Sequence, residues 1–71
     1  MPLSEIESGK IVRIVKINGG RGFRQKLLGL GLIPGVPVKV IQRGRGFPVV
    51  LSVMGNRVMI GCGMAGKVMV K

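Results

Sequence analysis

Glycine limits what this chain can fold into more than any other feature. Thirteen of the 71 residues are glycine, and they leave only short uninterrupted segments between them. Those segments are rich in Val and Ile, which pack well in β-strands. A chain of this length suffices for one domain, so we expect residues 1–71 to form a single domain with a small hydrophobic core.

Five segments have the composition of short strands. Residues 10–17 carry a charge at every third position, which fits neither strict strand alternation nor a helix. Their β-branched residues favour a strand, and the mixed register predicts a bulge or a sharp bend within it. Residues 36–42 alternate valine with other residues. The remaining strands, bounded by Gly and Pro turns, are expected at 49–53, 57–60 and 67–70, with Gly55-Asn56 as the turn between the first two of these.

One credible helix is expected, over residues 21–30. Phe23, Leu27 and Leu30 fall at i, i+4 and i+7 and form one apolar stripe. Gly31 occupies the place of a C′ glycine, which ends a helix, and the Pro-Gly pair that follows prevents a restart. Five short strands with one short helix between strands 1 and 2 predict a mainly β fold, a small barrel whose closure protects its strand edges.

The charge balance points to an anionic partner. Twelve Lys and Arg residues stand against Glu5 and Glu7 alone, which gives a net charge of +10. A charge of this size raises the encounter rate with nucleic acid, anionic lipid or an acidic protein face. Because it exceeds the ~2–8 that suffices to keep a small domain soluble, we favour binding over a merely solvated surface.

The residue types needed for catalysis are missing. The chain has no His, Asp, Tyr or Thr, and general acid–base catalysis needs a group that titrates near the working pH. Cys62 has no His to activate it as a nucleophile. We therefore expect no enzymatic activity and no cofactor.

A metal site within one copy of the chain is not expected either, since zinc and iron sites need several His, Cys or carboxylate ligands. Met54, Met59, Met64 and Met69 recur at five-residue intervals, which match neither the strand nor the helix period. They are predicted to fill the core rather than to form a soft copper site with Cys62. A metal-sensing site shared between chains through Cys62 remains an alternative.

Three features of the sequence indicate the cellular compartment of the protein. A single cysteine allows no intrachain disulfide, so nothing indicates an oxidising environment. The first eight residues lack the apolar region of a signal peptide, and no apolar run approaches the ~18 residues of a spanning helix. We expect a cytoplasmic protein, which could meet a membrane only at its surface.

Nucleic acid is the strongest alternative partner. Lys and Arg are spread along the whole chain, as in many phosphate-binding proteins. Proteins that bind single strands also use aromatic side chains on which bases stack, and Phe23 is expected in the core. Phe47, beside Arg43 and Arg45, would then be the sole platform. A small basic RNA-binding or ribosome-associated β-barrel therefore stays open, as the less favoured function.

The segment KLLGLGLIPG, residues 26–35, resembles the FeoA family, small SH3-like proteins that accompany the bacterial ferrous iron transporter. The likeness continues into the valine-alternating strand after it. It also includes Gly9-Lys10 near the start, Val53-x-Gly55 in the hairpin, and Ala65-x-x-Val68 at the end. The family often has arginine where this chain has Gly61-Cys62-Gly63, and an acid at the position of Met64.

The resemblance implies an SH3-like five-stranded barrel and a function. It implies a cytosolic accessory or regulatory adaptor of ferrous iron uptake that acts by binding the GTPase-containing cytosolic part of the membrane transporter. The resemblance thus implies that transporter as partner. The high positive charge would steer the chain towards an acidic cytosolic domain or towards the anionic inner membrane surface. A chain so poor in metal ligands suits an adaptor better than an iron carrier.

Two elements combine cations with apolar residues and are the predicted partner-binding site. The first is the exposed side of the helix, and the second is the turn before the third strand. The alternative is that Leu28 and Phe47 belong to the core and the arginines are simply solvated. The predicted partner-binding residues are Arg21, Arg24, Lys26 and Leu28 on the helix, and Arg43, Arg45 and Phe47 at the turn.

Overall fold

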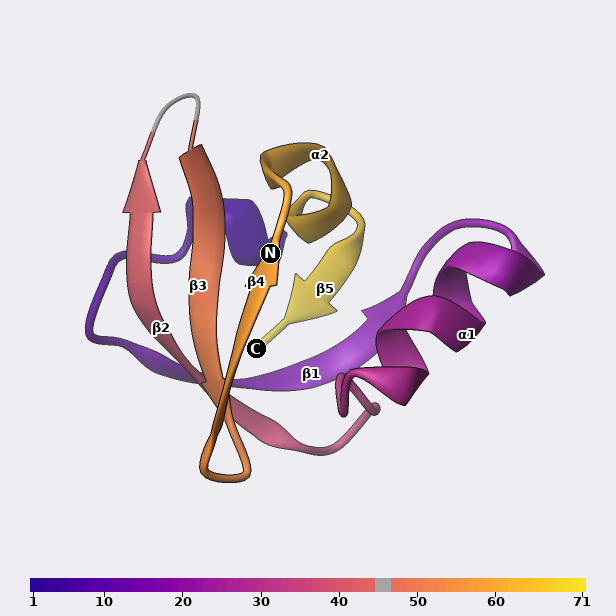
Figure 1. The fold of residues 1–71 in the computed structure, drawn as a ribbon, viewed down its shortest axis with the longest axis horizontal. Helices are drawn as coiled ribbons and strands as arrows, with labels where there is room; N and C mark the ends of the chain where they lie inside the picture. Colours follow the sequence, from indigo (N-terminus) through magenta and orange to yellow (C-terminus); the bar gives the residue numbers. More distant parts are fainter. Residues whose placement is uncertain (45–46) are drawn as a thin grey trace.

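The computed structural model describes residues 1–44 and 47–71 and shows a five-stranded antiparallel sheet with a short helix on one side (Figure 1). The strand order is β4-β3-β2-β1-β5. The predicted fold class is confirmed, including the helix between the first and second strands. The elements in chain order are η1 (Leu3–Glu5), β1 (Ile11–Ile17), α1 (Arg21–Gly29), β2 (Pro37–Gly44), β3 (Phe47–Val53), β4 (Asn56–Ile60), α2 (Cys62–Ala65) and β5 (Val68–Val70).

The first strand contains the predicted irregularity. The register of β1 on β5 shifts between Ile14 and Lys16, which leaves Val15 as an extra residue. Strict alternation after Ile14 would turn Lys16 inward and Ile17 outward. The bulge reverses both, so that Ile17 is buried and Lys16 is exposed.

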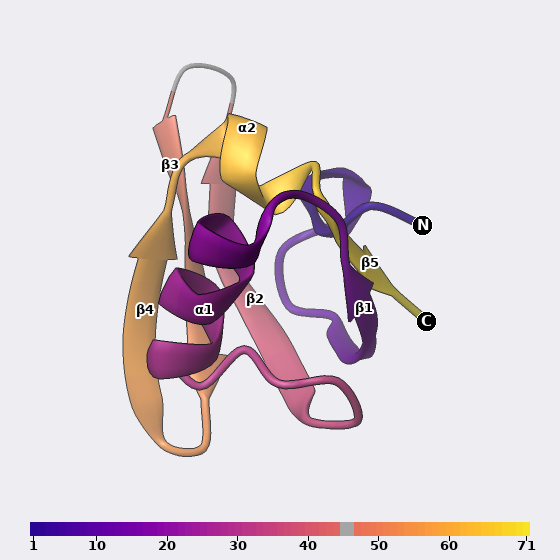
Figure 2. The same cartoon turned by 90° about the vertical axis from the view of Figure 1, so that its right-hand side faces the viewer.

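β1 also serves two partners. Residues 11–13 pair with β2, and residues 14–17 pair with β5. The sheet curls around a single core in consequence, but within the described residues no pairing joins β4 to β5. The barrel is therefore open at this seam, in contrast to the closure expected from sequence. The four-residue helix α2 bridges the seam between β4 and β5 (Figures 1 and 2).

The β3–β4 hairpin turns one residue earlier than predicted. Val53 pairs with Asn56, so Met54 and Gly55 form the two-residue loop. Both have positive φ, +48° and +82°, as a type I′ turn requires. Glycine takes the second position at no steric cost, and Asn56 is the first residue of β4 rather than part of the loop.

The predicted end of α1 is confirmed at Gly31, which has a φ of +92°. The N–H of Gly31 bonds the carbonyl of Leu28, and the N–H of Leu32 bonds that of Leu27, both at 3.0 Å. These two bonds define a Schellman motif, in which the residue after the glycine packs back onto the last helical turn. Leu27 and Leu32 are both fully buried. Leu30, predicted as the third member of the apolar stripe, is instead the C-cap and is 40% exposed.

Aliphatic side chains fill the core, and no polar or charged side chain is buried within the described residues. The prediction that the spaced methionines fill the core is wrong for three of the four. Met69 lies between the inward Val68 and Val70 of β5 and is outside the core cluster. Met54 lies in the hairpin loop, and Met59 is on the outer side of β4, where Val58 and Ile60 take the inward positions. Met64 does pack against the core.

Leu32→Ala is expected to lower the free energy of unfolding by about 2–5 kcal/mol, because it leaves a cavity beneath α1. Leu30→Ala is the matched control, since Leu30 is partly exposed, and it should cost less than about 1 kcal/mol. The chain has no Trp or Tyr, so urea unfolding should be followed by far-ultraviolet circular dichroism. Equal losses in the two variants would contradict the helix end described above.

Candidate functional site

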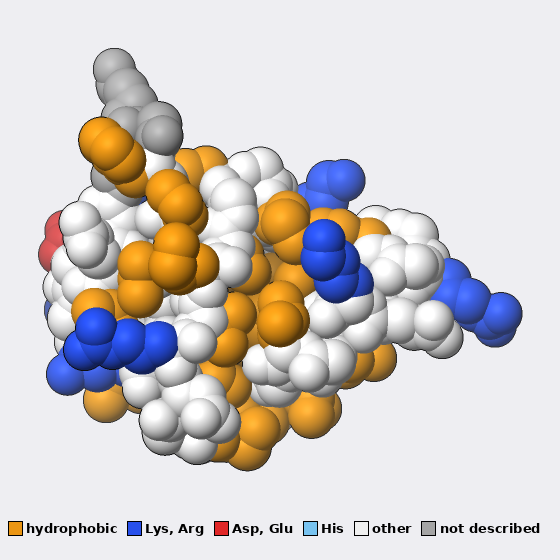
Figure 3. All heavy atoms as spheres, viewed as in Figure 1, with side chains coloured by type: hydrophobic (Ala, Val, Ile, Leu, Met, Phe, Trp, Pro, Cys, Tyr) orange, Lys and Arg blue, Asp and Glu red, His pale blue; other side chains and the backbone are white. Residues whose placement is uncertain are grey.

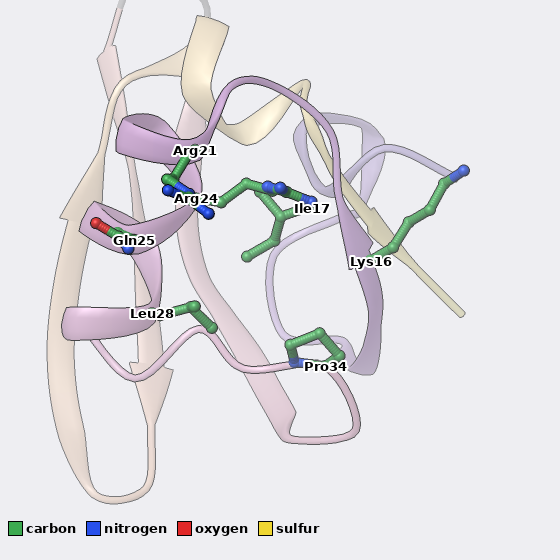
Figure 4. A pocket seen from close by; sticks show the side chains of 7 residues that line it. All are labelled: Lys16, Ile17, Arg21, Arg24, Gln25, Leu28 and Pro34. Carbon is green, nitrogen blue, oxygen red and sulfur yellow. The ribbon is translucent and has the colours of Figure 1, made fainter.

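A groove of about 370 Å³ lies between the end of β1, helix α1 and the loop that leads into β2. The space-filling view shows hydrophobic side chains gathered between the sheet and α1, with basic side chains over the helix (Figure 3). The groove combines an apolar floor with a basic rim. Its lining residues are Lys16, Ile17, Arg21, Arg24, Gln25, Leu28 and Pro34 (Figure 4).

The loop wall of the groove is a tight turn fixed to β1. The N–H of Val36 bonds the carbonyl of Ile33 at 3.0 Å, and Gly35 has a φ of +94°. Proline followed by a positive-φ glycine is the signature of a type II turn. The N–H of Gly35 donates to the carbonyl of Ile14 at 2.7 Å, and a guanidinium N–H of Arg13 donates to the Gly35 carbonyl at 2.6 Å. Pro34, between them, is thereby held beside β1.

The start of α1 is anchored as well. Phe23 is half-buried and packs against the core, and the ammonium of Lys67 lies 5.2 Å from the centre of its ring, within range of a cation–π interaction. The N–H of Asn18 donates to the carbonyl of Lys67 at 2.8 Å. With the Schellman motif at its other end, α1 presents its side chains to the groove from a fixed frame.

Basic and apolar side chains line different parts of the groove. Figure 4 shows Arg24 extending from α1 towards Ile17 on β1, with Leu28 and Pro34 facing the same space lower down. Lys16 contributes to the lining, but its side chain runs outward from β1, away from α1. The groove therefore suits an apolar side chain flanked by negative charge.

Three of the four predicted helix residues come together at the groove: Arg21, Arg24 and Leu28. Lys26 is exposed on α1 but is not part of the lining. Leu28 is 42% exposed, so the alternative that it belongs to the core is wrong. Leu27, the residue before Leu28 in sequence, is the helix residue that is buried in the core.

The second predicted element does not join the first. Phe47 is 67% exposed, so the core alternative is wrong for it too, but the β2–β3 end of the sheet lies far from α1 (Figure 1). A guanidinium N–H of Arg43 donates to the carbonyl of Ser4 at 2.9 Å, which ties β2 to η1. Arg45 lies outside the described residues. The structure thus offers two separate surfaces rather than one site.

Sequence reasoning did not find Lys16, Ile17, Gln25 or Pro34 as groove residues. Pro34 had a visible signal, since it follows the helix stop, but it was interpreted only as a helix breaker. Ile17 reaches the groove floor through the bulge in β1, and the residue at which a strand bulges cannot be fixed without its partner strands.

Cys62 is exposed, and its thiol donates to the carbonyl of Phe47 at 2.9 Å. Across residues 1–44 and 47–71, no group of three or more His, Cys, Asp and Glu residues is placed to hold a metal ion. No helix in this part of the chain has the length and apolar character needed to cross a membrane.

A family model described as the FeoA domain matches residues 1–71. The chain belongs to the FeoA family. This FeoA protein is 39% identical over 70 residues to a provisionally named Fe(2+) transport protein A of Methanocaldococcus jannaschii, and the match covers 99% of this chain and 84% of that protein. The family places it in ferrous iron transport and confirms the resemblance of its sequence.

Solved structures agree. A crystal structure of an iron uptake regulatory protein, FeoA, matches with a TM-score of 0.96 at 44% identity and covers 100% of this chain and 95% of that one. FeoA of Stenotrophomonas maltophilia, crystallised with zinc and described as a prokaryotic SH3 domain protein, matches with a TM-score of 0.86 at 22% identity. That match covers 100% of this chain and 89% of that one, and it shows that the fold is SH3-like.

Gly19→Ala should lower the free energy of unfolding by about 1–3 kcal/mol, because Gly19 has a φ of +126° that side chains rarely adopt. An added Cβ would also lie 2.8 Å from Cδ2 of Phe23. Gly22→Ala is the matched control within α1, where nothing obstructs a Cβ, and it should raise stability by up to about 1 kcal/mol. Urea unfolding curves of both variants test the anchoring of α1. Stabilisation by Gly19→Ala would contradict it.

Proposed function

We propose that this FeoA protein is a cytoplasmic accessory subunit of ferrous iron uptake. Its α1–β1 groove would bind the GTPase-containing cytosolic part of the transporter. The observation that carries the proposal is the groove itself: Arg21 and Arg24 flank an apolar floor, in a chain whose two acids both lie in its first seven residues. Family membership supports the choice of a transport partner.

The groove suits a short protein segment better than a small metabolite. It is an open cleft beside an exposed Leu28, and its polar groups are long arginine side chains rather than fixed donors directed at one point. Sites for small ligands enclose most of the ligand and present a few precisely placed polar groups. An acidic segment with a protruding aliphatic or aromatic side chain would match both the floor and the rim.

The two parts of the groove would contribute differently to binding. The arginines lie on the rim, so they would mainly speed association with an acidic surface and make it sensitive to salt. Leu28 would bury apolar area on contact and slow dissociation. The net charge of +10 adds long-range steering towards an acidic partner.

Arg21→Glu with Arg24→Glu should weaken binding to the purified transporter, held in detergent, by about 10-fold or more, mainly through slower association. Lys39→Glu with Lys71→Glu is the matched control. It changes the net charge by the same amount on exposed residues outside the groove. Biolayer interferometry gives both rate constants, with circular dichroism to confirm folding.

Equal weakening by the two double variants would remove the groove from the site and leave only a general charge effect. Leu28→Ser tests the apolar floor and should raise the dissociation rate while leaving the salt dependence unchanged. If nuclease treatment abolished binding in every variant, the basic RNA-binding alternative would replace the adaptor function.

A further inference from the structure

The bulge in β1 produces a second basic surface, on the side of the strand that faces away from α1. Arg13 points outward before the bulge, and Lys16 points outward only because of it. Figure 4 shows the Lys16 side chain leaving β1 on the side opposite the helix. The charges at every third residue of this segment fit no regular strand, but the bulge places Arg13 and Lys16 on the same face of β1.

Neighbouring strands add to this face. Ile11 is opposite Lys39 of β2 in the register of the sheet. Arg13 and Lys71 exchange both backbone hydrogen bonds, at 3.1 and 2.9 Å, so their side chains stand side by side on adjoining strands. Four cations thus surround the middle of β1. We define the β1 outer face as Ile11, Arg13, Val15, Lys16, Lys39 and Lys71.

Two aliphatic side chains lie exposed among these cations. Ile11 is 68% exposed and Val15 is 49% exposed. β-Branched aliphatics on a strand normally turn inward, yet the register directs Ile11 outward and the bulge leaves Val15 unpaired. Exposed aliphatics ringed by lysine and arginine are the composition of surfaces that rest on anionic bilayers.

We propose that the β1 outer face docks on an anionic lipid bilayer. Lys16, Lys39 and Lys71 would lie at the level of the headgroups, attracted to the negative surface. The guanidinium of Arg13 donates to the carbonyl of Gly35, so Arg13 would add its positive charge to theirs from a fixed position. Ile11 and Val15 would reach the boundary of the acyl chains. The strands that form the face contain no acidic side chain.

The exposed side chains favour lipid over nucleic acid. Binding to single strands relies on aromatic side chains that stack on bases, and the face has none. Both phenylalanines lie elsewhere, Phe23 on α1 and Phe47 at the start of β3. Aliphatic side chains gain little from a solvated phosphate backbone, but they gain from the interior of a bilayer.

The two surfaces could be occupied together. In Figure 2, β1 and β5 form the side of the molecule opposite β4, and α1 lies between these sides. A bilayer on the β1 outer face would leave Arg24 and Leu28 open to a protein partner. Confinement to the membrane surface would raise the effective concentration of the protein near any membrane-bound partner.

Vesicle co-sedimentation tests the proposal without the transporter. The wild-type chain should bind vesicles of phosphatidylcholine mixed with phosphatidylglycerol, and it should not bind pure phosphatidylcholine. Lys39→Glu with Lys71→Glu should weaken this binding about 30-fold or more, because each cation near an anionic surface contributes about 1 kcal/mol. Arg21→Glu with Arg24→Glu, of equal net charge, should weaken it less than about threefold.

Ile11→Ser, which leaves the charge unchanged, should weaken vesicle binding about fivefold by removing an inserted side chain. Equal losses in the two double variants would overturn the proposal, since charge alone would then explain binding. Equal binding to neutral vesicles would overturn it too, as would displacement of the protein from vesicles by a single-stranded RNA oligonucleotide. The readout is independent of transporter binding, so failure here would leave the proposed function untouched.

Discussion

The bulge in β1 is the constraint on which the rest of this small structure depends. One seven-residue strand must pair with β2 through its first half and with β5 through its second, while supplying both core and surface. The shift after Ile14 makes this compatible with the sequence. It sends Ile17 inward to close the core and form the groove floor, and it sends Lys16 outward among the other cations. Without it, a lysine would face the core, at a desolvation cost that a domain of this size could hardly bear.

The segment that carries the family resemblance has a comparable double role. Two of its leucines are buried and two are exposed. Leu27 and Leu32 pack in the core at the Schellman motif, whereas Leu28 and Leu30 lie on the surface. The proline and glycine that follow form a type II turn bonded to β1, and this turn is the second wall of the groove. One short stretch therefore fixes the helix end, the loop and the spacing between them. The groove is consequently held in place without a large core.

The arrangement of the strands and the helix also determines where the positive charges lie on the surface. Almost every cation lies on the surface because the core of the described residues is wholly apolar, but the strands and the helix sort these cations onto distinct sides. The arginines of α1 face the groove, whereas those residues of β1, β2 and β5 that point outward form the opposite basic face. The cations thus fall on two surfaces, each with its own exposed apolar residues, Leu28 on one and Ile11 and Val15 on the other. Arg43 lies apart from both surfaces, and its guanidinium ties β2 to the carbonyl of Ser4.

The fold class, the helix with its glycine stop, the bulge in the first strand and the family could all be predicted from the sequence. Each of these rests on local propensity or on the order of short motifs. Packing and strand pairing were needed to show that Leu32 rather than Leu30 is buried at the end of α1, where the hairpin turns, that the barrel stays open between β4 and β5, and which cations share a face. The position of the hairpin turn and the direction of the strand side chains depend on pairing register, and a shift of one residue reverses the direction of every side chain that follows in the strand. The helix residues and the residues of the β2–β3 turn, which the sequence grouped as one binding site, therefore lie apart in space. Ile17 and Pro34 become groove residues only when β1, α1 and the loop between α1 and β2 pack together.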